Sequence, residues 1–296
     1  MTRKKASDFH PDVLRLFDQY VHGDLDRRAF IQKAAVYAVG GVTAAALLES
    51  LRPNFAWANQ VPESDPRISV SHRQFQSPQG SGSMSGYLAT PAQANKKLPA
   101  VVVYHENRGL NPYIEDVARR LAAQGYLAFA PDALAPLGGY PGNEDDARAL
   151  FAKLDQSKTQ EDLFAAVDFV QNHPQFSGRY GAVGFCYGGT MVNKLAVRRP
   201  DLAAGVPFYG AQPGSEETAR IKAPLLIHYA ENDERINAGW PAFEQALKAN
   251  KVEYQAHFYP GTQHGFHNDT TPRYDEKAAE LAWTRTLEFL DKHLKG

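Results

Sequence analysis

Apolar runs alternate with amphipathic stretches along most of the chain. Residues 99–104 form a continuous apolar run, which is typical of a central parallel strand. Residues 254–259 alternate like a strand, and further short strands are predicted at residues 126–130, 179–183, 203–209 and 224–229. Helical periodicity separates them and predicts helices at residues 114–124, 145–154, 161–172, 190–197, 240–250 and 276–294. This alternation predicts an α/β fold with a mostly parallel, doubly wound sheet and helices on both faces.

Two segments depart from this alternation. Residues 67–87 form two polar strand-like stretches around the turn-rich segment 77–82, which predicts an N-terminal antiparallel hairpin at the sheet edge. Residues 134–143 hold three glycines and two prolines, so we expect a loop, placed over the functional site.

The hexapeptide 184–189, Gly-Phe-Cys-Tyr-Gly-Gly, lies between a predicted strand and a predicted helix and holds the single cysteine of the chain. Strand, Gly-x-Cys-x-Gly and helix together are typical of a nucleophile elbow. The thiol of Cys186 would then lie at a helix N-terminus, where the positive end of the helix dipole favours the thiolate. The alternative is a buried structural cysteine beside a glycine turn.

A thiol nucleophile needs a base, and that base needs an orienting acid. Asp233 follows the predicted strand at 224–229, and His264 lies in a turn-rich loop after the strand at 254–259. The chain order nucleophile, acid, histidine is the order of hydrolases built around such an elbow. Glu231 and Glu234 are alternative acids, and His267 is an alternative base. His228 lies within a strand and is expected to be packed.

These motifs resemble the dienelactone hydrolase (carboxymethylenebutenolidase) family of α/β-hydrolases. The matching pieces are residues 101–109, 125–132, 183–189, Asp233 and 264–266, and the likeness covers residues 68–294. The resemblance implies an α/β-hydrolase fold and a Cys-His-Asp triad that cleaves a small ester or lactone without a cofactor. It also implies that Glu106 helps to deprotonate the thiol and that the backbone N–H groups of Asn107 and Tyr187 form the oxyanion hole. The alternative is a non-catalytic ligand-binding protein on the same fold.

The sequence departs from the family where two arginines hold the substrate carboxylate. Asn268 and Pro136 occupy those positions, and neither can replace a bidentate guanidinium. Arg108 or Arg273 are alternative partners for a carboxylate. The expected substrate pocket comprises Arg108, Tyr140, Phe266 and Asn268.

The amino-terminal region 1–58 has the pattern of a twin-arginine export signal. Arg27 and Arg28 precede an apolar stretch, residues 34–48, and an Ala-x-Ala pattern at 56–58. This predicts passage through the twin-arginine translocase to the periplasm, with residues 59–296 forming the hydrolase domain. The alternative is an uncleaved N-terminal helical extension of a cytoplasmic protein.

Composition narrows the remaining classes of partner. The formal net charge is −1, so no basic surplus points to nucleic acid. A single cysteine cannot form an internal disulfide. The histidines lack metal-ligand spacing with the cysteine, and no dinucleotide-binding glycine motif opens a helix. We therefore expect a small-molecule substrate and no metal; oligomer formation is left open.

Overall fold

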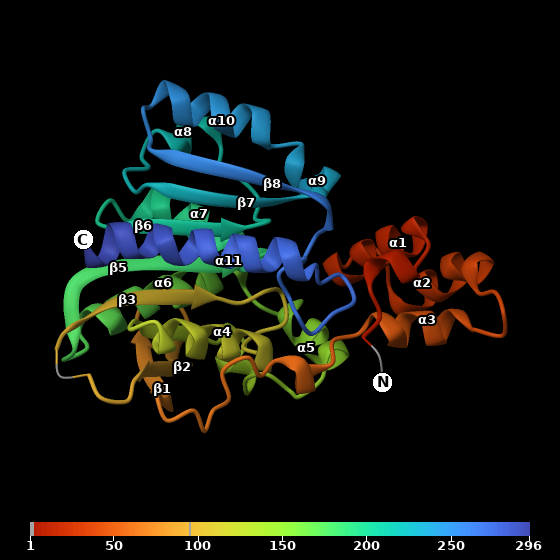
Figure 1. Cartoon of the computed structure of the whole chain (residues 1–296), viewed down its shortest axis with the longest axis horizontal. Helices are drawn as coiled ribbons and strands as arrows, with labels where there is room; N and C mark the ends of the chain where they lie inside the picture. Colours follow the sequence, from red (N-terminus) through yellow and green to blue (C-terminus); the bar gives the residue numbers. More distant parts are fainter. Residues whose placement is uncertain (1–2, 95) are drawn as a thin grey trace.

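The computed structural model describes residues 3–94 and 96–296 and has one twisted sheet at its centre (Figure 1). Within this described part the sheet has eight strands in the order β1-β2-β4-β3-β5-β6-β7-β8. The antiparallel β1–β2 and β2–β4 pairings lie at one edge, and all other pairings are parallel. The strands are β1 Ile68–Ser77, β2 Gly82–Pro91, β3 Leu98–Tyr104, β4 Leu127–Pro131, β5 Phe176–Phe185, β6 Ala204–Phe208, β7 Leu225–Asn232 and β8 Tyr254–Gln263. The predicted parallel sheet and edge hairpin are confirmed.

Helices cover both faces of the sheet, as the doubly wound prediction requires. The apolar sides of α4 and α11 pack on one face, and those of α6, α7 and α10 pack on the other. The helices of this part are α4 Pro112–Ala123, α5 Glu144–Phe151, α6 Gln156–Gln171, α7 Tyr187–Arg198, α8 Ser215–Thr218, α9 Glu234–Asn237, α10 Trp240–Ala249 and α11 Glu276–Leu290, which a π-helical turn, Asp291–Lys295, extends.

Strand β3 shows why a central strand of this sheet has an apolar residue at every position. Val101 and Val103 point into the core under α4 and α11, whereas Val102 and Tyr104 point into the core under α6 and α7. Side chains of successive strand residues lie on opposite faces, so a strand covered on both faces must be apolar at every position. Burying each valine contributes on the order of 1.5–3 kcal/mol.

The amino-terminal residues fold into a separate helical unit, which we call the N-terminal unit (residues 3–57). It comprises α1 Pro11–His22, α2 Arg27–Ala34 and α3 Ala44–Leu51 with three short 3₁₀ turns. Its own apolar core includes Phe17, Phe30 and Leu48. Gly23, with φ of 91°, ends α1 in the left-handed conformation. The unit lies beside the carboxyl ends of the parallel strands (Figure 1, red to orange).

The stretch expected to be the apolar middle of an export signal is not one continuous helix. A 3₁₀ turn at Ala35–Tyr37 and a turn region around Gly40 and Gly41 separate α2 from α3. Arg27 starts α2 and pairs with Glu49 and Asp145. Among the described residues, no helix combines the length and apolar character that crossing a membrane needs.

Candidate active site

Cys186 lies at the sharp turn between β5 and α7. Its backbone is strained, with φ of 55° and ψ of −112°. A Cβ on Gly184 would clash with the carbonyl of Gly188, and a Cβ on Gly188 would clash with the carbonyl of Tyr104. Only glycine therefore allows the strand and the helix to approach so closely on either side of the cysteine.

His264 and Asp233 form a buried pair beside Cys186. The distance from His264 Nδ1 to Asp233 Oδ2 is 2.5 Å, and both residues are about 95% buried. Asp233 follows β7 and caps α9, and His264 follows β8, so adjacent parallel strands bring the two side chains together. The ring of Tyr209 lies 4.9 Å from the His264 ring and packs against it.

The alternative acids and bases lie elsewhere. Glu231 and Glu234 are exposed. His267 shares a hydrogen bond with the Tyr113 hydroxyl and stacks on Phe185. His228 contacts Tyr259 and Thr286 inside the fold. Burial lowers the pKa of both His267 and His228 well below the ordinary histidine value, so both rings are neutral core groups.

Glu106 follows β3 and lies in the same region. Asn268 Nδ2 donates a hydrogen bond of 2.8 Å to Glu106 Oε2. Burial, reinforced by the nearby Cys186 sulfur, raises the pKa of Glu106 from 4.5 to about 7. A carboxyl group with such a pKa can exchange a proton near neutral pH.

His22 is the site residue that sequence reasoning missed. It is the last residue of α1, and its Nε2 lies 3.5 Å from Cys186 Sγ. Its ring meets the His264 ring edge-on, with the ring centres 4.9 Å apart. No motif surrounds this histidine, and 164 residues separate it from the cysteine. Only the docking of the N-terminal unit brings it to the thiol.

The charges around the sulfur favour the thiolate. Burial disfavours the thiolate, but the neighbouring His264 and His22 outweigh this effect of burial. They hold the pKa of Cys186 well below its usual value. Burial also opposes the charged form of His264, yet Cys186 and Asp233 raise its pKa to about 10. His22 behaves alike: burial lowers its pKa, whereas Asp18 and Cys186 raise it above the ordinary value.

A cavity of about 340 Å³ opens next to the sulfur. Its lining combines the expected oxyanion-hole residues Asn107 and Tyr187 with three guanidinium groups and no carboxylate. The guanidinium groups are those of Arg108, Arg148 and Arg235. A second, narrower cavity, which Cys186 also lines, includes Glu106, His264, Asn268 and Arg273 in its lining, among others.

The expected pocket residues divide between these cavities and the core. Arg108 lines both cavities, and Asn268 lines the narrower one. Tyr140 lines neither; it donates a hydrogen bond to Glu144 and packs against Phe55 of the N-terminal unit. Phe266 is fully buried between Tyr209 and Tyr259, so it is a core residue and not a pocket residue. Pro136 lies in a 3₁₀ turn, Ala135–Leu137.

One group of described residues has the donor atoms for a metal ion. The ligand atoms of His22, Cys186 and His264 all lie within 4.8 Å of one another. Sulfur with two imidazoles suits a soft or borderline cation such as Zn²⁺. The same three atoms also suit nucleophilic catalysis, in which the imidazoles exchange protons with the sulfur.

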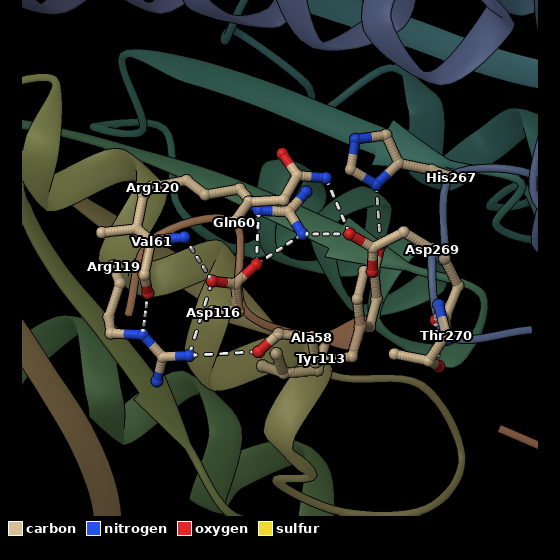
Figure 2. Close-up of polar contacts among 12 residues, drawn as sticks. Ala58, Gln60, Val61, Tyr113, Asp116, Arg119, Arg120, His267, Asp269 and Thr270 are labelled. Atoms are coloured by element: carbon tan, nitrogen blue, oxygen red, sulfur yellow. Dashed lines mark hydrogen bonds and ion pairs between the residues drawn. The ribbon is translucent and has the colours of Figure 1, made fainter. Parts of the chain in front are cut away.

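A buried polar network anchors the loop that follows His264 (Figure 2). Arg120 on α4 bridges the carboxylates of Asp116 and Asp269. The backbone N–H of Val61 donates to Asp116, and Arg119 donates to the carbonyl of Val61. The network therefore fixes the loop that follows His264 and the chain that follows the N-terminal unit to the same helix.

Comparisons with known proteins show which family the chain belongs to. The family model described as "Dienelactone hydrolase family" matches residues 84–294, and a model described as "YqhI-like" matches residues 1–39. A provisionally assigned carboxymethylenebutenolidase of Saccharolobus solfataricus is 33% identical over 248 residues, covering 69% of this chain and 92% of its own. A provisionally assigned hydrolase fragment of Escherichia coli K12, YghX, is 55% identical over 114 residues, covering 38% of this chain and 97% of its own.

A solved structure shows the same architecture. The crystal structure of a provisionally assigned dienelactone hydrolase from Klebsiella pneumoniae superposes with a TM-score of 0.66 at 27% identity, covering 76% of this chain and 99% of that one. The family resemblance and the α/β-hydrolase fold expected from the sequence are thereby confirmed. This chain belongs to the dienelactone hydrolase family and is a lactone or ester hydrolase.

Proposed function

We propose that the protein hydrolyses a small ester or lactone through Cys186, His264 and Asp233. The observation that carries this proposal is the buried His264–Asp233 pair, with its 2.5 Å contact, beside a cysteine on a strained elbow. A nucleophile, a base and an orienting acid on the ends of neighbouring strands are the components of covalent acyl transfer.

The chemistry proceeds in two halves. The Cys186 thiolate attacks the carbonyl carbon, and the N–H groups of Asn107 and Tyr187 stabilise the resulting oxyanion. The oxyanion collapses to a thioester as the C–O bond breaks, and protonated His264 gives its proton to the leaving alkoxide. Neutral His264 then takes a proton from water, the hydroxide attacks the thioester, and the thiolate leaves with release of the acid.

The lining of the larger cavity supports a substrate that carries a negative group. Three guanidinium groups line this cavity, of which Arg108 also pairs with Glu144 behind it at 3.6 Å, and guanidinium binds carboxylate or phosphate well. Burial lowers the pKa of Arg108, but its ordinary value is so high that the guanidinium stays charged. Asn268 and Pro136 do not supply the guanidinium clamp of the family; Arg148 and Arg235 approach the cavity from other directions.

A matched substrate panel tests this function. It compares pairs of p-nitrophenyl esters and lactones with and without a free carboxylate, together with dienelactone, on wild type and Cys186→Ala. We expect turnover by wild type, preference for the acidic member of each pair, and no turnover by Cys186→Ala with an unchanged melting temperature. Equal turnover by both proteins would disprove the thiol mechanism. Ligand-dependent melting without any turnover would favour the non-catalytic binding protein.

We also propose that the N-terminal unit is retained as an extension and is not removed as an export signal. Its three helices share a core, and it contacts the hydrolase domain through Tyr20–Asp145 and Arg273–Asp18, among other pairs. The mass of the protein purified from its native source tests this proposal. A mass that corresponds to residues 59–296, together with a periplasmic location, would instead support export through the translocase with cleavage.

A further inference from the structure

The carboxyl end of α1 docks on the catalytic loops through its backbone. The carbonyl of Val21 accepts hydrogen bonds from Asn107 Nδ2 at 2.9 Å and from Arg108 at 3.0 Å. The carbonyl of Tyr20 accepts one from Arg148 at 3.1 Å. The last carbonyls of a helix carry partial negative charge and lack partners within the helix, so guanidinium groups are favourable there. This docking places the next residue, His22, over the sulfur.

The His22 ring is held in one orientation. Its Nδ1 lies 2.8 Å from the carbonyl oxygen of Asp18 and 3.3 Å from the Asp18 carboxylate. An Nδ1–H that donates to these oxygens makes Nε2 the ring nitrogen that carries the lone pair and can accept a proton. Nε2 faces Cys186 Sγ at 3.5 Å and Arg235 at 2.9 Å. The side chain is only 14% exposed, so the ring is held rather than free in solvent.

The second imidazole at the sulfur is arranged differently. His264 is held at Nδ1 by Asp233, yet within the described part of the chain its Nε2 makes no hydrogen bond. Both imidazoles lower the pKa of Cys186, and His22 Nε2 lies 3.5 Å from its sulfur, so His22 is a second imidazole partner of the nucleophile beside the histidine to which the elbow and the chain order point. Two aspartate–histidine pairs face one sulfur from opposite parts of the chain.

We propose that His22, oriented by Asp18, is the base that takes the thiol proton of Cys186, so that the N-terminal unit supplies a catalytic residue. The S–H bond breaks, the proton moves to Nε2, and a thiolate–imidazolium pair forms without a change in net charge. Arg235 donates to the same lone pair of the neutral ring, so proton transfer to Nε2 requires this exposed guanidinium to give up its hydrogen bond. His264 is then free to serve the leaving group and the water. This inference rests on the thiol chemistry proposed above.

Alkylation of the thiol tests the proposal without any hydrolysis substrate. Because Cys186 is the single cysteine of the chain, the rate of reaction with iodoacetamide reports on this thiolate alone. The full-length wild type, His22→Gln, Asp18→Asn and the control His72→Gln, whose side chain is 70% exposed, are compared between pH 5 and pH 9. Circular dichroism and melting temperature show whether each variant is folded.

We expect His22→Gln to react about 10-fold more slowly than wild type near pH 6, because its thiol stays protonated to higher pH. The Asp18→Asn profile should shift in the same direction by less, and the His72→Gln profile should match wild type. Free imidazole should restore alkylation to His22→Ala, which a purely structural role of the ring would not allow. Profiles of His22→Gln and wild type that superimpose would overturn the proposal.

Hydrolysis adds a second readout. If His22 takes the thiol proton, kcat of His22→Gln falls about 10²-fold while KM changes little. Faster hydrolysis by His22→Gln would overturn the proposal and show that the ring obstructs the site. Wild-type hydrolysis by Cys186→Ala would refute the proposed function instead, and the alkylation profiles would still report on His22.

Discussion

Asn268 donates its side-chain amide to Glu106 across 162 residues of sequence, with 2.8 Å between Nδ2 and Oε2. The same amide oxygen accepts hydrogen bonds from the backbone and hydroxyl of Thr270. Asn268 therefore holds the buried carboxyl group of Glu106 and its own loop. This position, where the sequence departs from the family's arginine, serves the interior of the site rather than a substrate carboxylate.

Glu106→Gln should change how stability depends on pH. The carboxyl group has a pKa of about 7 in the folded protein against 4.5 ordinarily, so between these values the folded state binds more protons than the unfolded state. The contribution of Glu106 to the free energy of unfolding should therefore fall as pH rises from about 4.5 to 7, by at most about 3 kcal/mol, and then level off.

The glutamine side chain keeps the shape but cannot titrate. Urea unfolding of wild type and Glu106→Gln at pH 4.5, 6 and 8 measures the difference in their free energies of unfolding. This difference should favour the variant increasingly as pH rises. A constant difference between the two proteins across this range would show that Glu106 is ionised at an ordinary pKa.

Asp233→Asn should reduce kcat by about 10²- to 10⁴-fold, because the amide cannot hold the correct histidine tautomer or stabilise the imidazolium. Glu231→Gln and Glu234→Gln are the matched controls, and near wild-type kcat is expected for both because their side chains are exposed. Steady-state kinetics on one active ester decide the question. A large loss of kcat in either glutamate variant, with kcat of Asp233→Asn unaffected, would show that this glutamate is the acid that orients the histidine.

Gly188→Ala should destabilise the protein by about 1–3 kcal/mol or more and remove activity. The added Cβ would clash with the backbone carbonyls of Tyr104 and His105, which cannot move without shifting β3. Gly214→Ala is the control, since its Cβ would come no nearer than 3.6 Å to a flexible Glu217 carboxylate. Thermal melts and kinetics of the two variants should differ clearly; equal stability would mean that the elbow is less tightly packed than described.

Arg120→Ala should lower the free energy of unfolding by about 3–5 kcal/mol, because two buried carboxylates lose the cation between them. The exposed Arg220→Ala, which loses only a 3.8 Å contact with Glu217, should cost less than about 1 kcal/mol. Chemical denaturation gives both values. Since Asp269 belongs to the loop after His264, kcat should also fall in Arg120→Ala; a fall in stability with unchanged kcat would show that the network does not position His264.

Most of the sheet could be predicted from the sequence because its rules are local. A strand buried on both faces must be apolar throughout, as residues 98–104 are, and a helix covering it must have one apolar side, as α4 has. The helix at 161–172 begins earlier than predicted, at Gln156, because Asp155 caps its first turn with two hydrogen bonds to backbone N–H groups. The polar residues that follow this cap hid the start of the helix.

The candidate catalytic residues that lie in sequence motifs could also be predicted from the sequence. The elbow around Cys186 needs glycines at fixed offsets, and Asp233 and His264 follow strands in a set order, so local patterns determined these candidates. The tertiary structure alone decided which of several histidines lie at the sulfur. His267 and His228 face the core, whereas His22 reaches the site because the end of α1 docks on Asn107, Arg108 and Arg148. Contacts between residues so distant in sequence depend on how whole elements pack, and no local pattern records that packing.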